Sequence, residues 1–212
     1  MAKSLLILGG GGHASVLVDI LKEQGRVILG VVAPVIESEH LCNLRHYTKD
    51  EDVFLFKPSD VILVNGIGSM PRESLRRDIY YKFTELGYLF ETVIASSAIV
   101  SSMATFEQGV QILQGAIIQV GVNVMANTII NSGAILEHDC HIGMNNHIAP
   151  GAKLSGGVKT ANNVHLGTGS SVIQKIKIGE YVIVGAGAVV CENVHEKTIC
   201  FPARTSYKEL KI

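Results

Sequence analysis

The sequence of 212 residues lacks several features that would each point to a class of protein. It has no tryptophan, only 6% aromatic residues, and no CxxC pair among its four cysteines. Unpaired, scattered cysteines argue against a structural zinc site and against a disulfide framework. The formal net charge of −1 leaves no basic excess, so nucleic acids and anionic membranes are not expected partners.

Long apolar runs are also missing. The apolar run near the N-terminus, residues 5–8, is far too short for a secretory signal or a membrane span. We therefore expect no membrane insertion and a cytoplasmic location. Hydrophobic residues nevertheless make up 47% of the chain, and with so few aromatics this composition suits an interior too narrow for large rings.

A six-residue repeat occupies the second half of the chain. Counting in sixes from Ile94 to Val190, every position except Thr160 carries a large apolar residue. The positions four residues further on are small or β-branched, with Asn146 as the main exception. An α-helix repeats near 3.6 residues and an ordinary strand every two, so neither fits this register. The period is typical of a parallel β-helix, in which three six-residue units close each coil.

The first ninety residues show a different pattern. Residues 4–8 predict a buried strand, and the glycines at 9–12 with His13 predict a turn that leads into a helix. A strand, a glycine turn and a helix N-terminus form the arrangement that binds phosphates. No acidic residue ends the second strand, expected at 27–32, which disfavours an NAD site. Alternatively, the glycines serve only close packing of strand and helix.

A second glycine turn follows the strand expected at 60–65. Gly68 ends this turn, Ser69 is predicted to cap the next helix, and that helix should stop at Gly87 before a fourth strand at 88–93. Arg76 lies either on a solvated helix face or near a bound phosphate. The pattern predicts a small parallel Rossmann-like α/β domain at 1–93 and an all-β domain at 94–212.

The repeat also maps the outer surface of the β-helix, because residues eighteen apart lie about 4.8 Å apart in adjacent coils. The neighbours of His138 and Asp139 in adjacent coils include Gly156, Gly121 and Gly157. Glycines beside a histidine and an acid leave room for a substrate and offer a backbone N–H to an oxyanion. The register therefore predicts a pocket at His138.

Three interpretations of the histidines remain open at this point. His138 could act as a general base that Asp139 orients. Alternatively, histidines from adjacent coils or subunits could bind zinc, as in the γ-class carbonic anhydrases, which are also β-helical. His147 and His165 share one column, whereas His141 lies on a different side of the prism. In the third interpretation, all of them are surface residues on turns.

Several segments together resemble the NeuD-like sugar acyltransferases. These segments are Leu-Glu-His-Asp-Cys-His-Ile-Gly (136–143), His-Ile-Ala-Pro-Gly-Ala (147–152), Leu-Ser-Gly-Gly-Val (154–158), the two glycine turns and a closing Phe-Pro-Ala-Arg (201–204). The family includes sialic acid O-acetyltransferases and N-acetyltransferases of UDP-linked 4-amino sugars. The resemblance covers nearly the whole chain and implies a left-handed β-helix and a homotrimer with active sites between subunits.

The resemblance also implies roles for individual residues. His138 matches the catalytic base and Asp139 the acid that raises its basicity. Contacts to the co-substrate acetyl-CoA are implied for His147, Gly156, Thr168, Ala186 and Gly187. Contacts to the diphosphate of a nucleotide-linked acceptor are implied for Gly11, Gly12, His13, Gly68 and Arg76. One departure is that Val32-Ala33-Pro34 stands where members acting on UDP-sugars often carry an acid.

The predicted activity is transfer of acetyl from acetyl-CoA to the amine of a nucleotide-linked amino sugar, with UDP as the expected nucleotide and no metal. O-acetylation of sialic acid or a related sugar is the alternative within the family. A metal-dependent hydratase and a non-catalytic binding protein are the alternatives outside it.

Overall fold

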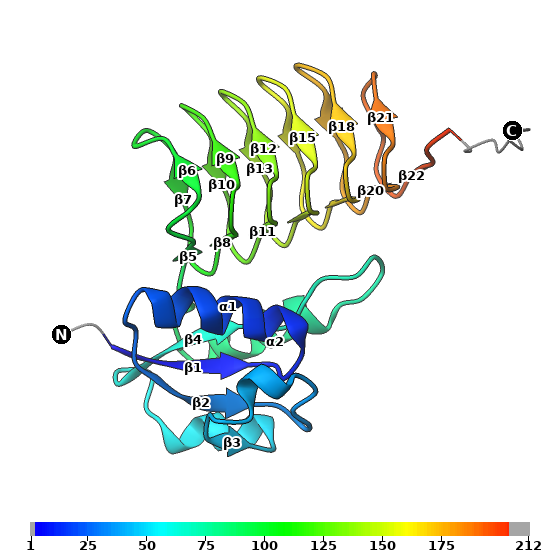
Figure 1. Ribbon diagram of the computed structural model, residues 1–212. Coiled ribbons are helices and arrows are strands. Elements are labelled where there is room, and N and C mark those ends of the chain that lie inside the picture. The colour runs from blue at the N-terminus through cyan, green and yellow to red at the C-terminus, as the bar shows by residue number, and fades with distance from the viewer. Residues whose placement is uncertain (1–2, 204–212) are drawn as a thin grey trace, which may run out of the picture.

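The structure is a computed structural model that describes residues 3–203. Arg204, the last residue of the Phe-Pro-Ala-Arg segment, and the rest of the predicted second domain to residue 212 lie outside the described residues. An α/β part comes first in the chain, and a prism of stacked coils follows it (Figure 1). Within residues 3–203, neither helix combines the length and the apolar character needed to span a bilayer.

The α/β part is built on a four-stranded parallel sheet of order β3-β2-β1-β4. Its strands are β1 (Ser4–Leu8), β2 (Ile28–Val32), β3 (His46–Tyr47) and β4 (Val61–Asn65). Its helices are α1 (Gly12–Glu23), α2 (Leu75–Glu85) and the short 3-10 helices Glu39–Leu41 and Asp50–Leu55. Alternate residues of β1 face opposite sides, so Leu5 and Ile7 pack with α1 while Leu6 packs with the cluster that contains α2.

Two predictions for this part were wrong in detail. The second helix begins at Leu75 after Ser74, not after Ser69, because the intervening chain is a loop in which Arg72 has a φ of 71°. This left-handed conformation is incompatible with an α-helix. The expected fourth strand at 88–93 is reduced to an isolated bridge between Phe90 and Leu63.

The prism has three parallel faces, numbered here in the order in which the chain first visits them. Face 1 contains β5 (Val93–Ile94), β8 (Gln111–Ile112), β11 (Ile129–Ile130), β14 (His147–Ile148), β17 (His165–Leu166), β20 (Ile183–Val184) and β22 (Ile199–Cys200). Face 2 contains β6 (Ile99–Val100), β9 (Ile117–Ile118), β12 (Ile135–Leu136), β15 (Lys153–Leu154), β18 (Ser171–Val172) and β21 (Val189–Val190). Face 3 contains β7 (Thr105–Phe106), β10 (Asn123–Val124), β13 (His141–Ile142), β16 (Lys159–Thr160) and β19 (Lys177–Ile178).

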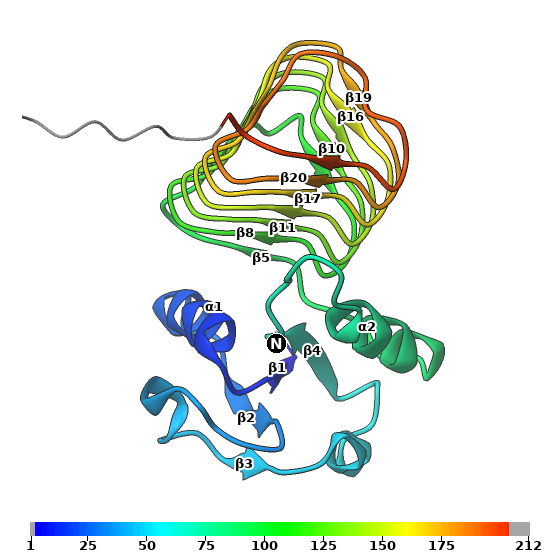
Figure 2. The same cartoon turned by 90° about the vertical axis from the view of Figure 1, so that its right-hand side faces the viewer.

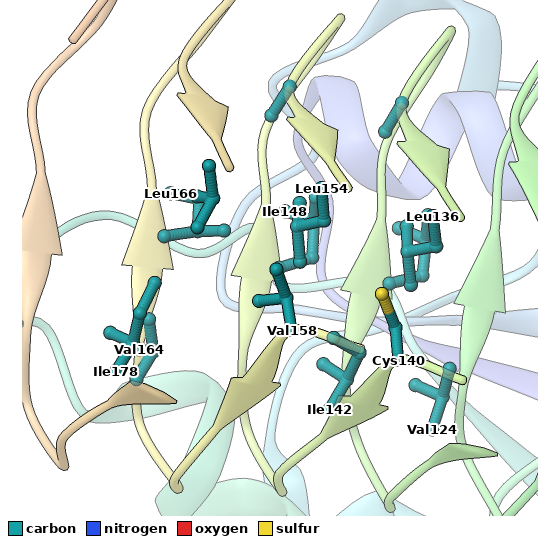
Figure 3. Packing of buried hydrophobic residues seen from close by; sticks show 14 of the residues in the cluster. Val124, Leu136, Cys140, Ile142, Ile148, Leu154, Val158, Val164, Leu166 and Ile178 are labelled. Atoms are coloured by element: carbon teal, nitrogen blue, oxygen red, sulfur yellow. The ribbon is translucent and has the colours of Figure 1, made fainter. Parts of the chain in front are cut away.

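The six-residue register is confirmed. Each position counted in sixes from Ile94 to Val190 is the second residue of a two-residue strand. Both inward series pack into one continuous core along the prism (Figure 3). Cys140 is fully buried in it, as expected for a cysteine used as a small hydrophobic residue. The fold class is therefore the predicted one, a small parallel α/β sheet followed by a left-handed β-helix.

The two polar exceptions in the register are partners of each other. The Asn146 Nδ2 donates to Thr160 Oγ1 at 2.6 Å, and its Oδ1 accepts from the Val164 N–H at 2.7 Å. Both side chains are buried. The exceptions therefore form one hydrogen-bonded unit inside the prism, which satisfies polar groups that an apolar pair would leave without partners.

The α/β part packs against face 1. Leu113 and Ile129, on the outer side of this face, belong to the same hydrophobic cluster as α1. Viewed along the prism, the corner between faces 2 and 3 points away from the α/β part (Figure 2).

Candidate active site

His138 and Asp139 lie on the corner between faces 2 and 3 and are hydrogen-bonded to each other. The distance from His138 Nδ1 to Asp139 Oδ2 is 2.8 Å. Because a carboxylate only accepts hydrogen bonds, Nδ1 carries the proton and Nε2 of the neutral ring has a free lone pair. The side chains are 61% and 71% exposed in the single chain, so this base is open to an incoming substrate.

Glycines lie beside this pair in the adjacent coils, as the register predicted, but the space that they leave is filled by the His138 and Asp139 side chains and not left open for a substrate. A Cβ on Gly156 would lie against Nε2 of the His138 ring, and a Cβ on Gly121 would lie 2.6 Å from Asp139 Oδ1. The Gly157 N–H donates to the His138 carbonyl oxygen at 2.8 Å, and this bond fixes the register of the two coils. No acceptor for the Gly156 N–H is recorded within residues 3–203, so this donor is available beside the base.

His147 lies on face 1, buried under the α/β part. Its Nδ1 donates to the Ser69 carbonyl oxygen at 3.0 Å, and its Nε2 accepts from Asn131 Nδ2, also at 3.0 Å. Asn131 is itself oriented by the Ser132 N–H, which donates to its Oδ1 at 2.8 Å. Burial, followed by the charges of neighbouring groups, lowers the pKa of His147 to about 3. The ring is therefore neutral with both nitrogens engaged, so a ring nitrogen would have to release one of these partners to contact acetyl-CoA.

Thr168, Ala186 and Gly187 lie together on the corner between faces 1 and 2. The Gly187 N–H donates to the Thr168 carbonyl oxygen at 2.9 Å, as expected for residues one coil apart. All three residues are exposed in the single chain, with Thr168 one coil from the other two along the prism axis. Their role as acetyl-CoA contacts stays a prediction.

The glycine turn lines a cavity of about 700 Å³ at the carboxyl ends of β1, β2 and β4. Gly11, Gly12, His13 and Gly68 all line it, so the structure brings these predicted residues together. The N-terminus of α1 opens into it with no side-chain cap and no acidic residue in its first turn, a favourable position for an anion. Burial and the charge of Arg76 lower the pKa of His13 to about 4, while His13 Nε2 donates to Gln111 Oε1 at 2.7 Å.

Arg76 does not line the glycine-turn cavity. Its side chain is buried, and its Nη1 donates to the carbonyl oxygens of Asn65 at 2.9 Å and Ile67 at 2.7 Å. Its Nε lies 3.4 Å from the Asn127 carbonyl oxygen. Arg76 therefore joins the second glycine turn to the β-helix, and neither a solvated helix face nor a direct diphosphate contact describes its position.

Glu37 is a functional candidate that the sequence analysis missed. It lines the glycine-turn cavity, its N–H donates to the Gly10 carbonyl oxygen at 2.9 Å, and its Oε2 lies 3.3 Å from the position of a Cβ on Gly11. A carboxylate therefore lies beside the glycine turn, although it comes five residues after the end of β2. The loop after β2 folds back over the turn, and a count from the end of the strand could not reveal this.

Metal-ligand geometry is absent from residues 3–203, where no group of three or more His, Cys, Asp or Glu side chains could hold an ion. His147 and His165 do share one column, as predicted, with ring centroids 4.9 Å apart. His141 lies on face 3, also as predicted.

Sequence comparison finds no family model and no curated protein that matches the chain. Solved structures match over nearly its whole length. PerB from Caulobacter crescentus, in complex with CoA and GDP-perosamine, is 28% identical with a TM-score of 0.83 over 94% of both chains. The acetyltransferase domain of PglB from Neisseria gonorrhoeae, in complex with acetyl coenzyme A, is 25% identical with a TM-score of 0.81 over 93% of this chain and 95% of that chain. WeeI from Acinetobacter baumannii, at 19% identity and a TM-score of 0.78 over 93% and 96%, shares the fold.

The likeness to the NeuD-like sugar acyltransferases is confirmed. The predicted enzyme class, an acyltransferase, is the class of these relatives, and the predicted co-substrate is a molecule with which one of them was solved. Direct transfer of acetyl to a bound acceptor requires a base and an acceptor pocket close to each other. In a single chain they lie apart, because the glycine-turn cavity belongs to the part packed on face 1 while His138 occupies the corner on the far side of the prism (Figure 2).

Proposed function

We propose that the protein transfers acetyl from acetyl-CoA to the amine of a nucleotide-linked amino sugar. The observation that carries this proposal is the His138–Asp139 hydrogen bond of 2.8 Å, which leaves Nε2 as a base directly above Gly156. PerB, a relative of similar length, is described with CoA and a GDP-linked sugar in its structure, which supports the same pair of substrates here.

In the proposed mechanism the amine attacks the thioester carbonyl carbon directly. His138 Nε2 takes the proton that the amine loses as the C–N bond forms. The Gly156 N–H stabilises the oxyanion of the tetrahedral intermediate. Asp139 holds the ring in the required tautomer and stabilises the imidazolium that forms. When the C–S bond breaks, His138 returns the proton to the departing thiolate, so no covalent acyl-enzyme is needed.

The glycine-turn cavity is the proposed acceptor site. The backbone of Gly11 and Gly12 at the start of α1 would hold the diphosphate. Glu37 would accept hydrogen bonds from ribose hydroxyls, the role that an acidic residue has in related glycine-turn sites. UDP remains the proposed nucleotide, and GDP is a second candidate because of the sugar nucleotide found with PerB.

We further propose that the site forms between subunits of a homotrimer. The base and the cavity lie on opposite sides of one prism, which supports a site to which two chains contribute. Face 2 also presents an outward column of isoleucines, in which Ile99 pairs with Ile117 and Ile117 with Ile135. Ile99 is 66% exposed in the single chain, and a column of this kind favours cover by another subunit.

An acceptor screen tests the proposal. Purified protein is incubated with acetyl-CoA and, separately, UDP-linked and GDP-linked 4-amino sugars and free sialic acids, and products are identified by mass spectrometry. We expect a 42-dalton gain on a nucleotide amino sugar. With His138→Ala the rate should fall by at least about a hundredfold, the usual scale for a lost general base. A mass gain only on sialic acid would show that the acceptor is a hydroxyl and not an amine. Equal rates for the wild type and His138→Ala would show that His138 is not the base.

A further inference from the structure

A second cavity, of about 230 Å³, lies beside the glycine-turn cavity. It is bounded by the 69–74 loop, the start of α2 and the corner between faces 3 and 1, and is called the corner cavity below. The residues that matter here are Arg72, Arg76, Arg77, Asn163, His165 and Tyr181. Among residues 3–203, Glu73 alone lines both cavities, so the corner cavity is separate from the proposed acceptor site.

The charge of Arg76 lacks a counter-ion. The residue is 6% exposed, and its guanidinium contacts only carbonyl oxygens, with no carboxylate at ion-pair distance within residues 3–203. Buried charges in proteins are normally paired. Burial lowers the pKa of Arg76 to about 9, as expected when nearby carbonyl dipoles do not replace the lost hydration. A bound anion would supply the missing negative charge.

Arg77 adds a second cation whose donors are poorly used. Its Nη1 lies 3.4 Å from both Asn163 Oδ1 and Tyr181 Oη, and its Nε lies 3.5 Å from Asp78 Oδ1. These distances are at the outer limit for hydrogen bonds, so the guanidinium can turn toward a better acceptor. A planar guanidinium fork matches two oxygens of a phosphoryl or carboxylate group.

His165 provides an independent sign of a missing partner. Its Nδ1 lies fully inside the structure without a hydrogen-bond partner. Buried polar atoms without partners are uncommon and each requires an explanation. The ring lines the corner cavity, but Nδ1 itself has no surface open to it, so a ligand oxygen there would reach Nδ1 only after the ring turns.

We propose that the corner cavity binds a small oxyanion, a phosphoryl or carboxylate group, through Arg77 and Tyr181 Oη beside the charge of Arg76. The three arginines outweigh Glu73, the single acid among the lining residues. A water molecule occupies about 30 Å³ in the liquid, so the cavity has room for a phosphate ion with some of its hydration.

The experiment is a calorimetric titration of the full chain with inorganic phosphate, and separately with acetate, at constant ionic strength and without acetyl-CoA or acceptor. We expect saturable binding that Arg77→Gln weakens about tenfold or more, because a charge-assisted bidentate contact is lost. Tyr181→Phe preserves shape and should weaken binding several-fold. Arg45→Gln removes an exposed arginine from another region and should leave the affinity unchanged.

Phosphate bound at the glycine turn is distinguished by Gly12→Asp, because a Cβ at Gly12 meets open space and the new carboxylate repels an anion there. The corner site should persist in this variant. Stronger binding of phosphate than of acetate identifies a phosphoryl ligand, and the reverse a carboxylate. The absence of saturable binding, or equal affinities for wild type and Arg77→Gln with native circular dichroism, would refute the proposal. Neither outcome bears on acetyl transfer, which is assayed separately.

Discussion

At the scale of single residues, the candidate base depends on the absence of a side chain at Gly156. The His138 ring lies where a Cβ on Gly156 would be, and Gly156 does not have a positive φ. Gly156→Ala should therefore push the ring out of place without straining the backbone. Because His138 is exposed, the ring can swing into solvent, and we expect stability within about 1 kcal/mol of wild type. The turnover number should fall about tenfold or more, measured by steady-state kinetics.

Gly115→Ala is the matched control for this substitution. Gly115 is also a corner glycine of the β-helix, its Cβ would have no neighbour closer than 3.9 Å, and it lies away from His138. Its φ of 69° makes alanine mildly unfavourable there, so the control should lose stability but keep its turnover. If both variants retained wild-type turnover, the position of the His138 ring would not matter to the reaction.

At the scale of elements, the Asn146–Thr160 unit stabilises one coil of the β-helix. Asn146→Val removes the acceptor of the buried Val164 N–H, and such an orphaned group costs about 1–3 kcal/mol. We expect hydrogen exchange at Val164 to accelerate accordingly, because opening of this coil becomes easier. Exchange followed by mass spectrometry or by nuclear magnetic resonance measures the change.

Thr160→Val and the double variant complete a cycle for the same unit. Asn146 Nδ2 donates directly to Thr160 Oγ1, so the two effects should not add, and a coupling of about 0.5–3 kcal/mol is expected. Strict additivity would show that the hydrogen bond contributes nothing to the coil. Ile142→Val is the control for altered packing alone. Ile142 is a buried residue of β13 that pairs with Thr160 of β16, and both the original and the new side chain are apolar.

The elements of the β-helix were predictable because its sequence signal is repetitive and local. Each large apolar residue of the six-residue repeat marks a strand. The spacing of eighteen residues between adjacent coils correctly placed Gly156 beside His138. The 69–74 loop was not predictable, since Ser69 and Pro71 carry the signals of a helix start while Arg72 adopts a left-handed conformation. The position of Glu37 in the glycine-turn cavity was not predictable for a related reason, because its approach to Gly11 depends on the path of a loop.

At the scale of the whole molecule, the junction between the α/β part and the prism combines apolar packing with polar contacts, and the polar contacts involve neutral histidines. His13 donates to Gln111, and His147 donates to Ser69. Gln111 is fully buried, which its residue type did not suggest. Sequence reasoning assigned His13 and Arg76 to ligands and did not predict this docking, because it depends on tertiary contacts between polar residues with no repeating pattern.

These histidines make stability depend on pH. Burial lowers the pKa of His147 to about 3 and that of His13 to about 4, from an ordinary 6.5. The unfolded chain therefore binds protons between about pH 6.5 and 4 that the folded chain does not, and the free energy of unfolding falls as pH falls through this range. At pH 5.5 the two residues together should cost about 3 kcal/mol relative to pH 7.5, as measured by urea unfolding.

His147→Asn isolates one part of this dependence. Asparagine keeps an N–H that can donate to the Ser69 carbonyl oxygen but cannot be protonated. The loss of stability between pH 7.5 and 5.5 should then shrink by about 1.4 kcal/mol. An unchanged pH dependence would mean that His147 is protonated as easily in the folded chain as in the unfolded one.

The separation of base and acceptor cavity gives the assembly its own test. A chain with His138→Ala keeps the glycine-turn cavity, and a chain with Gly12→Asp keeps the base. Each alone should be nearly inactive if the proposed roles are correct. When the two are unfolded together and refolded in equal amounts, random mixing in a closed ring of three places an intact base against an intact cavity in about a quarter of the sites.

We therefore expect the mixed preparation to recover about a quarter of wild-type turnover, measured per chain, while each variant refolded alone recovers none. Recovery requires that the two halves of a site come from different chains, because no chain in the mixture carries both intact. If base and cavity of one chain worked together, mixing would restore nothing. Refolded wild-type protein is the control for yield, and sedimentation velocity on the mixture checks that a trimer has formed, so that an inactive monomer is not mistaken for a site within one chain.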